Sequence, residues 1–232
     1  MAAKNDGRNL KKTTDAKLRV AILVTDGFEE AEMVEPRKFL DKQGAETVLI
    51  APKPGKVTAM NHDKKSESYK VDQTLDKANP DDFDAVLLPG GALNADALRV
   101  ESKAQEFVRE INDEHKPIAF ICHAPWLLVS AGLVNGRHLT SYHTIRDDIE
   151  NAGGRWTDSE TITDANWVSS RQPSDIPAFN EKMKDLFWSK REARTDESTA
   201  VSGDTRAGIA AGAKSAGAGQ PSGRGSAKSA SR

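Results

Sequence analysis

The chain lacks several features that mark secreted and membrane proteins. Only one of its 232 residues is a cysteine, so no disulfide bond can form within the chain. No apolar run reaches the roughly 18 residues that a membrane-spanning helix needs, and the N-terminal residues show no apolar segment typical of a secretory signal. We therefore expect a cytoplasmic protein with no membrane partner.

The chain also lacks a large net charge and any motif typical of metal or nucleotide binding. The formal net charge is -2, which gives no general attraction to nucleic acid. The five histidines show no spacing typical of metal ligands, and no glycine-rich loop for a nucleotide phosphate is present. We expect neither a bound metal nor another cofactor.

Composition divides the chain into three parts. Residues 195–232 are mostly alanine, glycine and serine with scattered charges, and such a segment cannot bury enough apolar surface to offset the entropy cost of ordering. We predict disorder for this tail and for an N-terminal arm over residues 1–16, and one α/β domain over residues 17–194. After Asp204 the tail carries five lysines and arginines and no acid, so a weak contact with DNA or RNA is an alternative to a fully solvated tail.

Short apolar runs alternate with amphipathic segments along the predicted domain. The runs predict strands at 18–24, 47–51, 83–88, 118–121, 138–141, 161–163 and 167–169. The amphipathic segments predict helices at 30–43, 102–112, 125–131, 145–152 and 176–190, and the polar stretch 53–72 predicts a small hairpin. This alternation favours an open, mostly parallel sheet with helices on both faces, in which ligands bind at the carboxyl ends of the strands.

Three of these strand ends carry residues suited to chemistry. Glu29 and Glu32 follow the first strand, Gly90-Gly91 follows the strand at 83–88, and Cys122-His123 follows the strand at 118–121. A lone cysteine is often a buried core residue, but a strand-to-helix junction can expose a thiol at the sheet edge as a nucleophile. We therefore expect a thiol, carboxylates and flexible amides to share one crevice.

Each of these residues also has a purely structural interpretation. The two glutamates are favourable at the N-terminus of a helix, and two glycines after a strand can be a plain turn. In the functional interpretation the amides of Gly90 and Gly91 point at a developing oxyanion. His123 reaches the same cavity as Cys122 only if the chain turns sharply, because neighbours on a regular strand point to opposite faces.

Five segments resemble the PfpI family, which is named for an intracellular protease and is related to the Parkinsonism-associated deglycase and to class I glutamine amidotransferase domains. In chain order they are residues 24–32, 83–91, 121–125, 140–142 with 147–148, and 166–171. The resemblance covers about residues 18–190. It implies a flavodoxin-like, three-layer α/β/α sandwich with a cysteine nucleophile at a strand-to-helix elbow.

The resemblance also implies a role for individual residues. The positions that match the family's site are the nucleophile Cys122, its neighbour His123, the thiol-contacting Glu32, a second acid Glu29, the pocket residue Tyr142, and Asp96, which some members lend to the histidine of an adjacent subunit. Family members are usually dimers or hexamers, so we expect a homodimer or a hexamer. The chain departs from the family at Phe120, which is large for an elbow, and at Ala95, where relatives have a proline in the loop that would bear Asp96.

Three functions use the same residues. We favour a cofactor-free stress-response enzyme in which Cys122 attacks a small reactive carbonyl compound or its adduct on a protein or peptide, as in glyoxalases and deglycases. The alternatives are an intracellular cysteine peptidase and a non-enzymatic redox sensor or chaperone in which Cys122 is oxidised. We also expect a protonated Glu32 and the helix dipole to keep Cys122 largely as thiolate at neutral pH.

Overall fold

A computed structural model describes residues 17–191 of the chain. The disorder predicted for residues 1–16 and 195–232, and the nucleic-acid contact predicted for the tail, lie outside the described residues. Within residues 17–191 no helix is both long and apolar enough to cross a bilayer. The cytoplasmic location stays a prediction.

Seven strands form the central sheet, in the order β11-β12-β8-β7-β1-β3-β6. Their bounds are β1 (Arg19–Leu23), β3 (Glu46–Ala51), β6 (Gln73–Thr74), β7 (Ala85–Leu88), β8 (Ile118–Ile121), β11 (Thr161–Asp164) and β12 (Trp167–Ser170). All neighbouring pairs are parallel except β11 with β12. The predicted mostly parallel sheet is confirmed. The connections from β1 and β7 lead to opposite sides of the sheet, which makes the carboxyl ends of these two strands a ligand-binding position in this topology.

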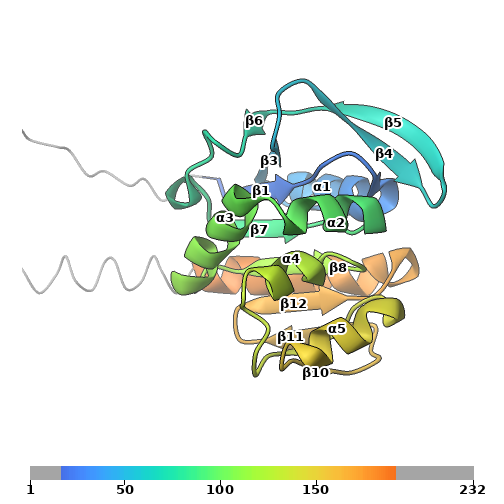
Figure 1. Cartoon of the computed structure of the whole chain (residues 1–232). Helices are drawn as coiled ribbons and strands as arrows, with labels where there is room; N and C mark the ends of the chain where they lie inside the picture. Colours follow the sequence, from blue (N-terminus) through green and yellow to red (C-terminus); the bar gives the residue numbers. More distant parts are fainter. Residues whose placement is uncertain (1–16, 192–232) are drawn as a thin grey trace, which may run out of the picture. The chain divides into compact units, whose positions relative to one another are not determined.

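Helices cover both faces of the sheet (Figure 1). One face packs against α1 (Glu30–Lys42) and a helix over residues 176–191, and these helices bury Met33, Leu40, Phe179 and Phe187. The other face packs against α2 (Ala92–Arg99), α3 (Ser102–Asp113), α4 (Pro125–Ser130) and α5 (Arg146–Asn151). Strands β7 and β8 are buried along their whole length because each lies between these two layers, and this explains their continuous apolar sequences.

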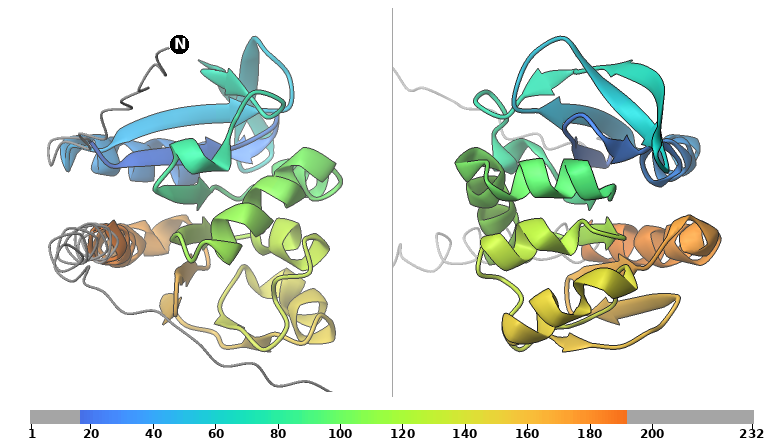
Figure 2. Two further views of the ribbon diagram at one scale, coloured as in Figure 1. Left: turned by 90° about the vertical axis from the view of Figure 1, so that its left-hand side faces the viewer. Right: turned by 45° about the vertical axis from the view of Figure 1, so that its right-hand side comes forward.

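A second, three-stranded sheet lies beside α1. Its strands are β2 (Phe28–Glu29), β4 (Lys56–Asn61) and β5 (Lys64–Lys70), and β4 and β5 form the predicted hairpin (Figures 1 and 2). The parallel pairing of β2 with β4 brings the hairpin to the start of α1, at the carboxyl edge of β1. Two-residue strands such as β2 and β6 carry too few residues for a periodic pattern, so the sequence did not predict them.

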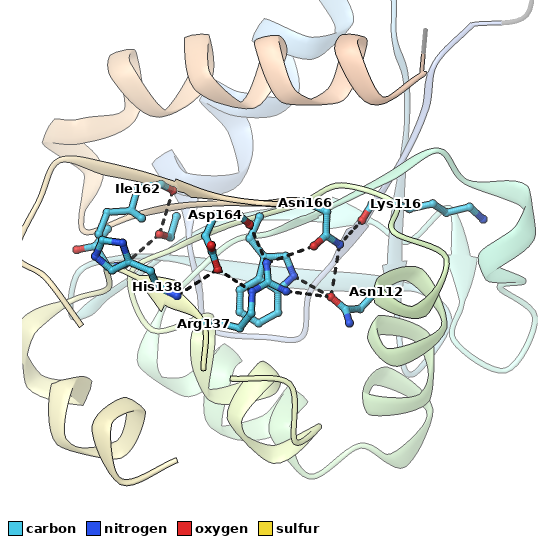
Figure 3. A network of polar contacts seen from close by, with 10 residues as sticks. Asn112, Lys116, Arg137, His138, Ile162, Asp164 and Asn166 are labelled. Carbon is cyan, nitrogen blue, oxygen red and sulfur yellow. Dashed lines mark hydrogen bonds and ion pairs between the residues drawn. The ribbon is translucent and has the colours of Figure 1, made fainter. Parts of the chain in front are cut away.

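A third small sheet pairs β9 (His138–Leu139) with β10 (Arg155–Trp156). Arg137, directly before β9, holds this region to the main sheet (Figure 3). Its guanidinium lies 3.7 Å from the ring centre of Trp167, donates from Nε to Asp164 Oδ2 at 2.8 Å, and donates from Nη2 to the Asp164 carbonyl oxygen at 2.8 Å. The planar guanidinium group stacks on the ring and donates hydrogen bonds at the same time, which a lysine side chain cannot do.

We expect Arg137→Ala to lower the free energy of unfolding by about 2–3 kcal/mol, because charged hydrogen bonds and a stacked cation are lost together. Arg137→Lys keeps the charge but not the fork, so it should recover only part of this loss. Urea unfolding of the three proteins measures both effects. Equal stability of the alanine variant and the wild type would show that the network does not stabilise the fold.

Candidate active site

Cys122 lies at a sharp turn between β8 and α4. Its φ is +63, in the left-handed region that residues other than glycine rarely adopt. Along β8 the side chains alternate, with Phe120 in the core beneath α3 and α4 and Ile121 in the core beneath α1. The turn breaks this alternation and places Cys122 on the Ile121 side. The predicted elbow is confirmed, and the size of Phe120 does not hinder it because that ring packs edge-on against Trp167 in the opposite core.

The strained φ has a measurable consequence. Glycine adopts this conformation freely, so we expect Cys122→Gly to be more stable than Cys122→Ala by about 1 kcal/mol. At Ala119, in the middle of the same strand, alanine should be more stable than glycine, so Ala119→Gly should destabilise the protein. Thermal or urea unfolding of these variants tests the prediction. A Cys122→Gly protein less stable than Cys122→Ala would contradict the elbow geometry.

The imidazole of His123 contacts the thiol despite being its chain neighbour. The distance from Cys122 Sγ to His123 Nδ1 is 3.1 Å, and His123 Nε2 lies 3.3 Å from the hydroxyl of Thr144. Burial lowers the pKa of His123, and the nearby His143 adds to this effect. A neutral imidazole that carries its hydrogen on Nε2 donates to Thr144 and leaves Nδ1 as an acceptor for the thiol proton. Thr144 was not predicted from the sequence, because it lies 21 residues from His123 along the chain.

Glu32 lies completely buried beside the thiol, in the first turn of α1. Its Oε2 accepts the N–H of Gly90 at 2.9 Å, and its Oε1 has no hydrogen-bond partner among the described residues. Burial raises the pKa of Glu32 to about 8, against the opposing effects of the Cys122 thiol and the Gly90 N–H. At neutral pH the carboxyl group is therefore mostly protonated, as the sequence analysis expected.

The predicted thiolate at neutral pH is wrong. Burial raises the pKa of the Cys122 thiol, and Glu32 raises it further once its own carboxyl group has ionised. The backbone N–H groups of Gly91 and His123 favour the thiolate but do not offset these effects. The site at rest therefore holds a neutral thiol, a neutral imidazole and a protonated carboxyl group, and the sulfur needs a base before it can attack.

One of the two glycines has a different role from the one predicted for it. The N–H of Gly90 is occupied by Glu32, so it does not point to a substrate oxygen. The N–H groups of Gly91 and of His123, the residue after the cysteine, both lower the pKa of the Cys122 thiol and so favour negative charge at the sulfur. The predicted oxyanion role is therefore wrong for Gly90 and stays a prediction for Gly91. Gly90 is required for another reason, since a Cβ there would lie 2.6 Å from Cys122 Cβ and 2.8 Å from the Ile121 carbonyl oxygen.

A pocket of about 470 Å³ opens above the thiol. Of the predicted residues, Glu29, Glu32, Gly91, Cys122, His123 and Tyr142 line it. The Tyr142 ring lies 5.0 Å from the His123 ring, and the Tyr142 N–H donates to the Cys122 carbonyl oxygen at 3.0 Å. The hairpin, the first turn of α2 and the segment after β12 add lining residues that the sequence did not predict, among them Met60, His62, Leu93, Gln172, Pro173 and Ser174.

Asp96 lies outside this pocket within a single chain. It sits on the exposed side of α2, a helix where the sequence analysis expected a loop. Two large exposed apolar side chains lie nearby, Leu93 on the same helix and Val100 directly after its end. A role for Asp96 at the site therefore requires a second subunit, as predicted, and stays a prediction.

Comparisons with known proteins agree with this geometry. The model of the DJ-1/PfpI family matches residues 18–185. The chain is 43% identical over 170 residues to Deglycase PfpI of Pyrococcus furiosus, an alignment that covers 73% of this chain and 99% of that protein. It is 36% identical over 169 residues to the putative cysteine protease YraA of Bacillus subtilis, covering 73% of this chain and 98% of that protein.

A solved structure shows the same fold. The crystal structure of Drosophila melanogaster DJ-1beta matches with a TM-score of 0.66 and 24% identity, covering 78% of this chain and 98% of that one. The flavodoxin-like sandwich and the family resemblance drawn from the motifs are thus confirmed. The chain belongs to the DJ-1/PfpI family.

Proposed function

We propose that the protein is a cofactor-free cysteine enzyme that acts on reactive carbonyl compounds or on their adducts with proteins and peptides, as part of a stress response in the cytoplasm. The observation that carries the proposal is the 3.1 Å contact between Cys122 Sγ and His123 Nδ1 at the base of a pocket. The Cys-His pair is the arrangement by which a weak thiol nucleophile is activated. The deglycase named among the relatives supports the same class of substrate.

In the proposed mechanism, His123 is the base. Nδ1 accepts the thiol proton as Sγ attacks the aldehyde carbon, and the new C–S bond turns the carbonyl oxygen into an oxyanion. We assign the stabilisation of that oxygen to the N–H groups of Gly91 and His123, because both favour negative charge at the neighbouring sulfur. The oxyanion then takes the proton back from His123 and becomes the hydroxyl of a hemithioacetal. Glu32, protonated and unpartnered at Oε1, is placed to exchange a proton with the same intermediate.

A parallel assay of wild type and Cys122→Ser tests this function. The proteins are incubated with methylglyoxal, with casein and with hydrogen peroxide, and lactate, released peptides and the mass of the chain are measured. We expect lactate from the wild type and a loss of about 1,000-fold or more in the serine variant. Cys122-dependent casein cleavage without lactate would favour the peptidase instead, for which the putative protease among the relatives is the supporting observation. Oxidation of Cys122 with neither product would favour the redox sensor.

We also propose that the active form is a homodimer or a hexamer in which Asp96 reaches the histidine of a neighbouring subunit. The exposed Leu93 on α2 and the exposed Val100 directly after it, both near Asp96 in sequence, support an interface on this helix. Light scattering combined with an activity assay tests the proposal. A fully active monomer would remove this role from Asp96.

A further inference from the structure

The side chains that line the pocket include acidic groups but no lysine or arginine among the described residues. The ionisable side chains of this lining are Glu29, Glu32, His62, Cys122, His123 and Tyr142. Glu32 is buried and mostly protonated at neutral pH. Glu29 is therefore the acidic group that can present a full negative charge to a ligand in this pocket.

The position of Glu29 is fixed by the hairpin. It directly precedes α1, and its Oε2 accepts the backbone N–H of His62 at 3.0 Å. Its side chain is only 13% exposed, and its Oε1 makes no hydrogen bond with residues 17–191. The imidazole of His62, by contrast, is 79% exposed, and its Nδ1 lies 4.0 Å from Glu29 Oε2. One oxygen of a held carboxylate is thus left for a ligand.

We infer that Glu29 selects substrates by charge, so that the site favours carbonyl adducts carrying a positive charge and disfavours carbonyl compounds carrying a carboxylate. This inference rests on the proposed function and assigns Glu29 to substrate binding, not to proton transfer. An adduct formed on a guanidinium fits the arrangement, since its N–H groups can donate to the free Oε1 of Glu29. Met60 and the exposed Leu93 offer apolar contacts for the alkyl stem of such a substrate.

The single cysteine of the chain allows a direct test. Methanethiosulfonate reagents transfer a small group to a thiol, forming a disulfide and releasing methanesulfinate. They are available with a trimethylammonium group, with a sulfonate group and with a neutral methyl group. The rates at which the cationic and anionic reagents label Cys122, each divided by the rate of the neutral one, report the charge that the pocket presents. The readout does not depend on turnover.

We expect wild type to favour the cationic over the anionic reagent, and Glu29→Gln to lower this preference by about tenfold, because one unit charge acts on two reagents of opposite sign. Asp113→Asn is the matched control, since it makes the same charge change at an exposed position, the last residue of α3, which precedes the amino end of β8. It should leave the preference unchanged. Raising the salt concentration should also reduce the preference in wild type.

An equal preference in wild type and Glu29→Gln, or a wild type that favours the anionic reagent, would overturn the inference. Turnover of methylglyoxal and of glyoxylate, which carries a carboxylate, separates it from the proposed function. Glu29→Gln should reduce the ratio of methylglyoxal turnover to glyoxylate turnover. A charge preference without lactate production would overturn the proposed function and leave the binding role of Glu29. Lactate production with no charge preference would leave the proposed function and overturn the binding role of Glu29.

Discussion

Gly90→Ala is expected to reduce turnover at least about 100-fold. The added methyl group would lie between the Glu32 carboxyl group and the Cys122 side chain, at 2.6 Å from Cys122 Cβ. These two groups are the ones whose alignment the proposed mechanism needs, and a shift of about 1 Å at such a position is enough for a loss of this size. The same shift should lengthen the 2.9 Å bond between the Gly90 N–H and Glu32, leaving the carboxyl group even less solvated.

Gly44→Ala is the control for this prediction. Gly44 also has a backbone conformation that disfavours alanine, with φ of +88, but nothing lies within 4 Å of the added methyl group. That variant should lose about 1 kcal/mol of stability and keep its turnover. Turnover and urea unfolding are measured for both variants. A Gly90→Ala enzyme with wild-type turnover would show that the thiol and the carboxyl group do not lie as described.

Glu32→Gln is expected to remove much of the pH dependence of stability. An unfolded Glu32 loses its proton near its ordinary pKa of 4.5, whereas the folded protein holds that proton up to about pH 8. Between these pH values unfolding releases a proton, so the stability of wild type falls as the pH rises through this window. A shift of this size corresponds to about 5 kcal/mol. Glutamine carries no such proton, and its amide can still accept from Gly90 and donate toward the sulfur.

The measurement is urea unfolding of both proteins at pH 5 and at pH 8.5. Glu32→Gln should lie within about 1 kcal/mol of wild type at pH 5 and should be more stable by several kcal/mol at pH 8.5. Glu35 is an exposed position on the same helix, so Glu35→Gln should have the stability of wild type at both pH values. If the free energy of unfolding changed equally between pH 5 and pH 8.5 in Glu32→Gln and in wild type, a protonated Glu32 would be contradicted.

The sequence predicted the elements that carry strong local signals. The strands at 18–24, 83–88 and 118–121 are confirmed because strands buried on both faces must be apolar throughout. From these strands alone the parallel topology brings Cys122 and Glu32 to one edge. The position of the thiol was predictable since the chain must turn between a strand and a helix.

What the sequence did not predict depends on pairings between distant residues. The contact of β2 with β4 places His62 against Glu29, 33 residues away, and no local pattern encodes it. The acceptor of the Gly90 N–H was missed for the same reason, since Glu32 lies 58 residues away. The ionisation of Cys122 was predicted wrongly because helix position can be read from the sequence, whereas the burial that raises the pKa cannot.

Stoichiometric alkylation of the single cysteine tests the central proposal, that Cys122 is the nucleophile, most directly. Iodoacetamide is added in increments, and the label on each chain, measured by mass spectrometry, is compared with the remaining turnover of methylglyoxal. The account predicts that turnover falls in proportion to the label, reaches zero at one label per chain, and is protected by prior addition of substrate. A fully labelled protein that still converts methylglyoxal would contradict it.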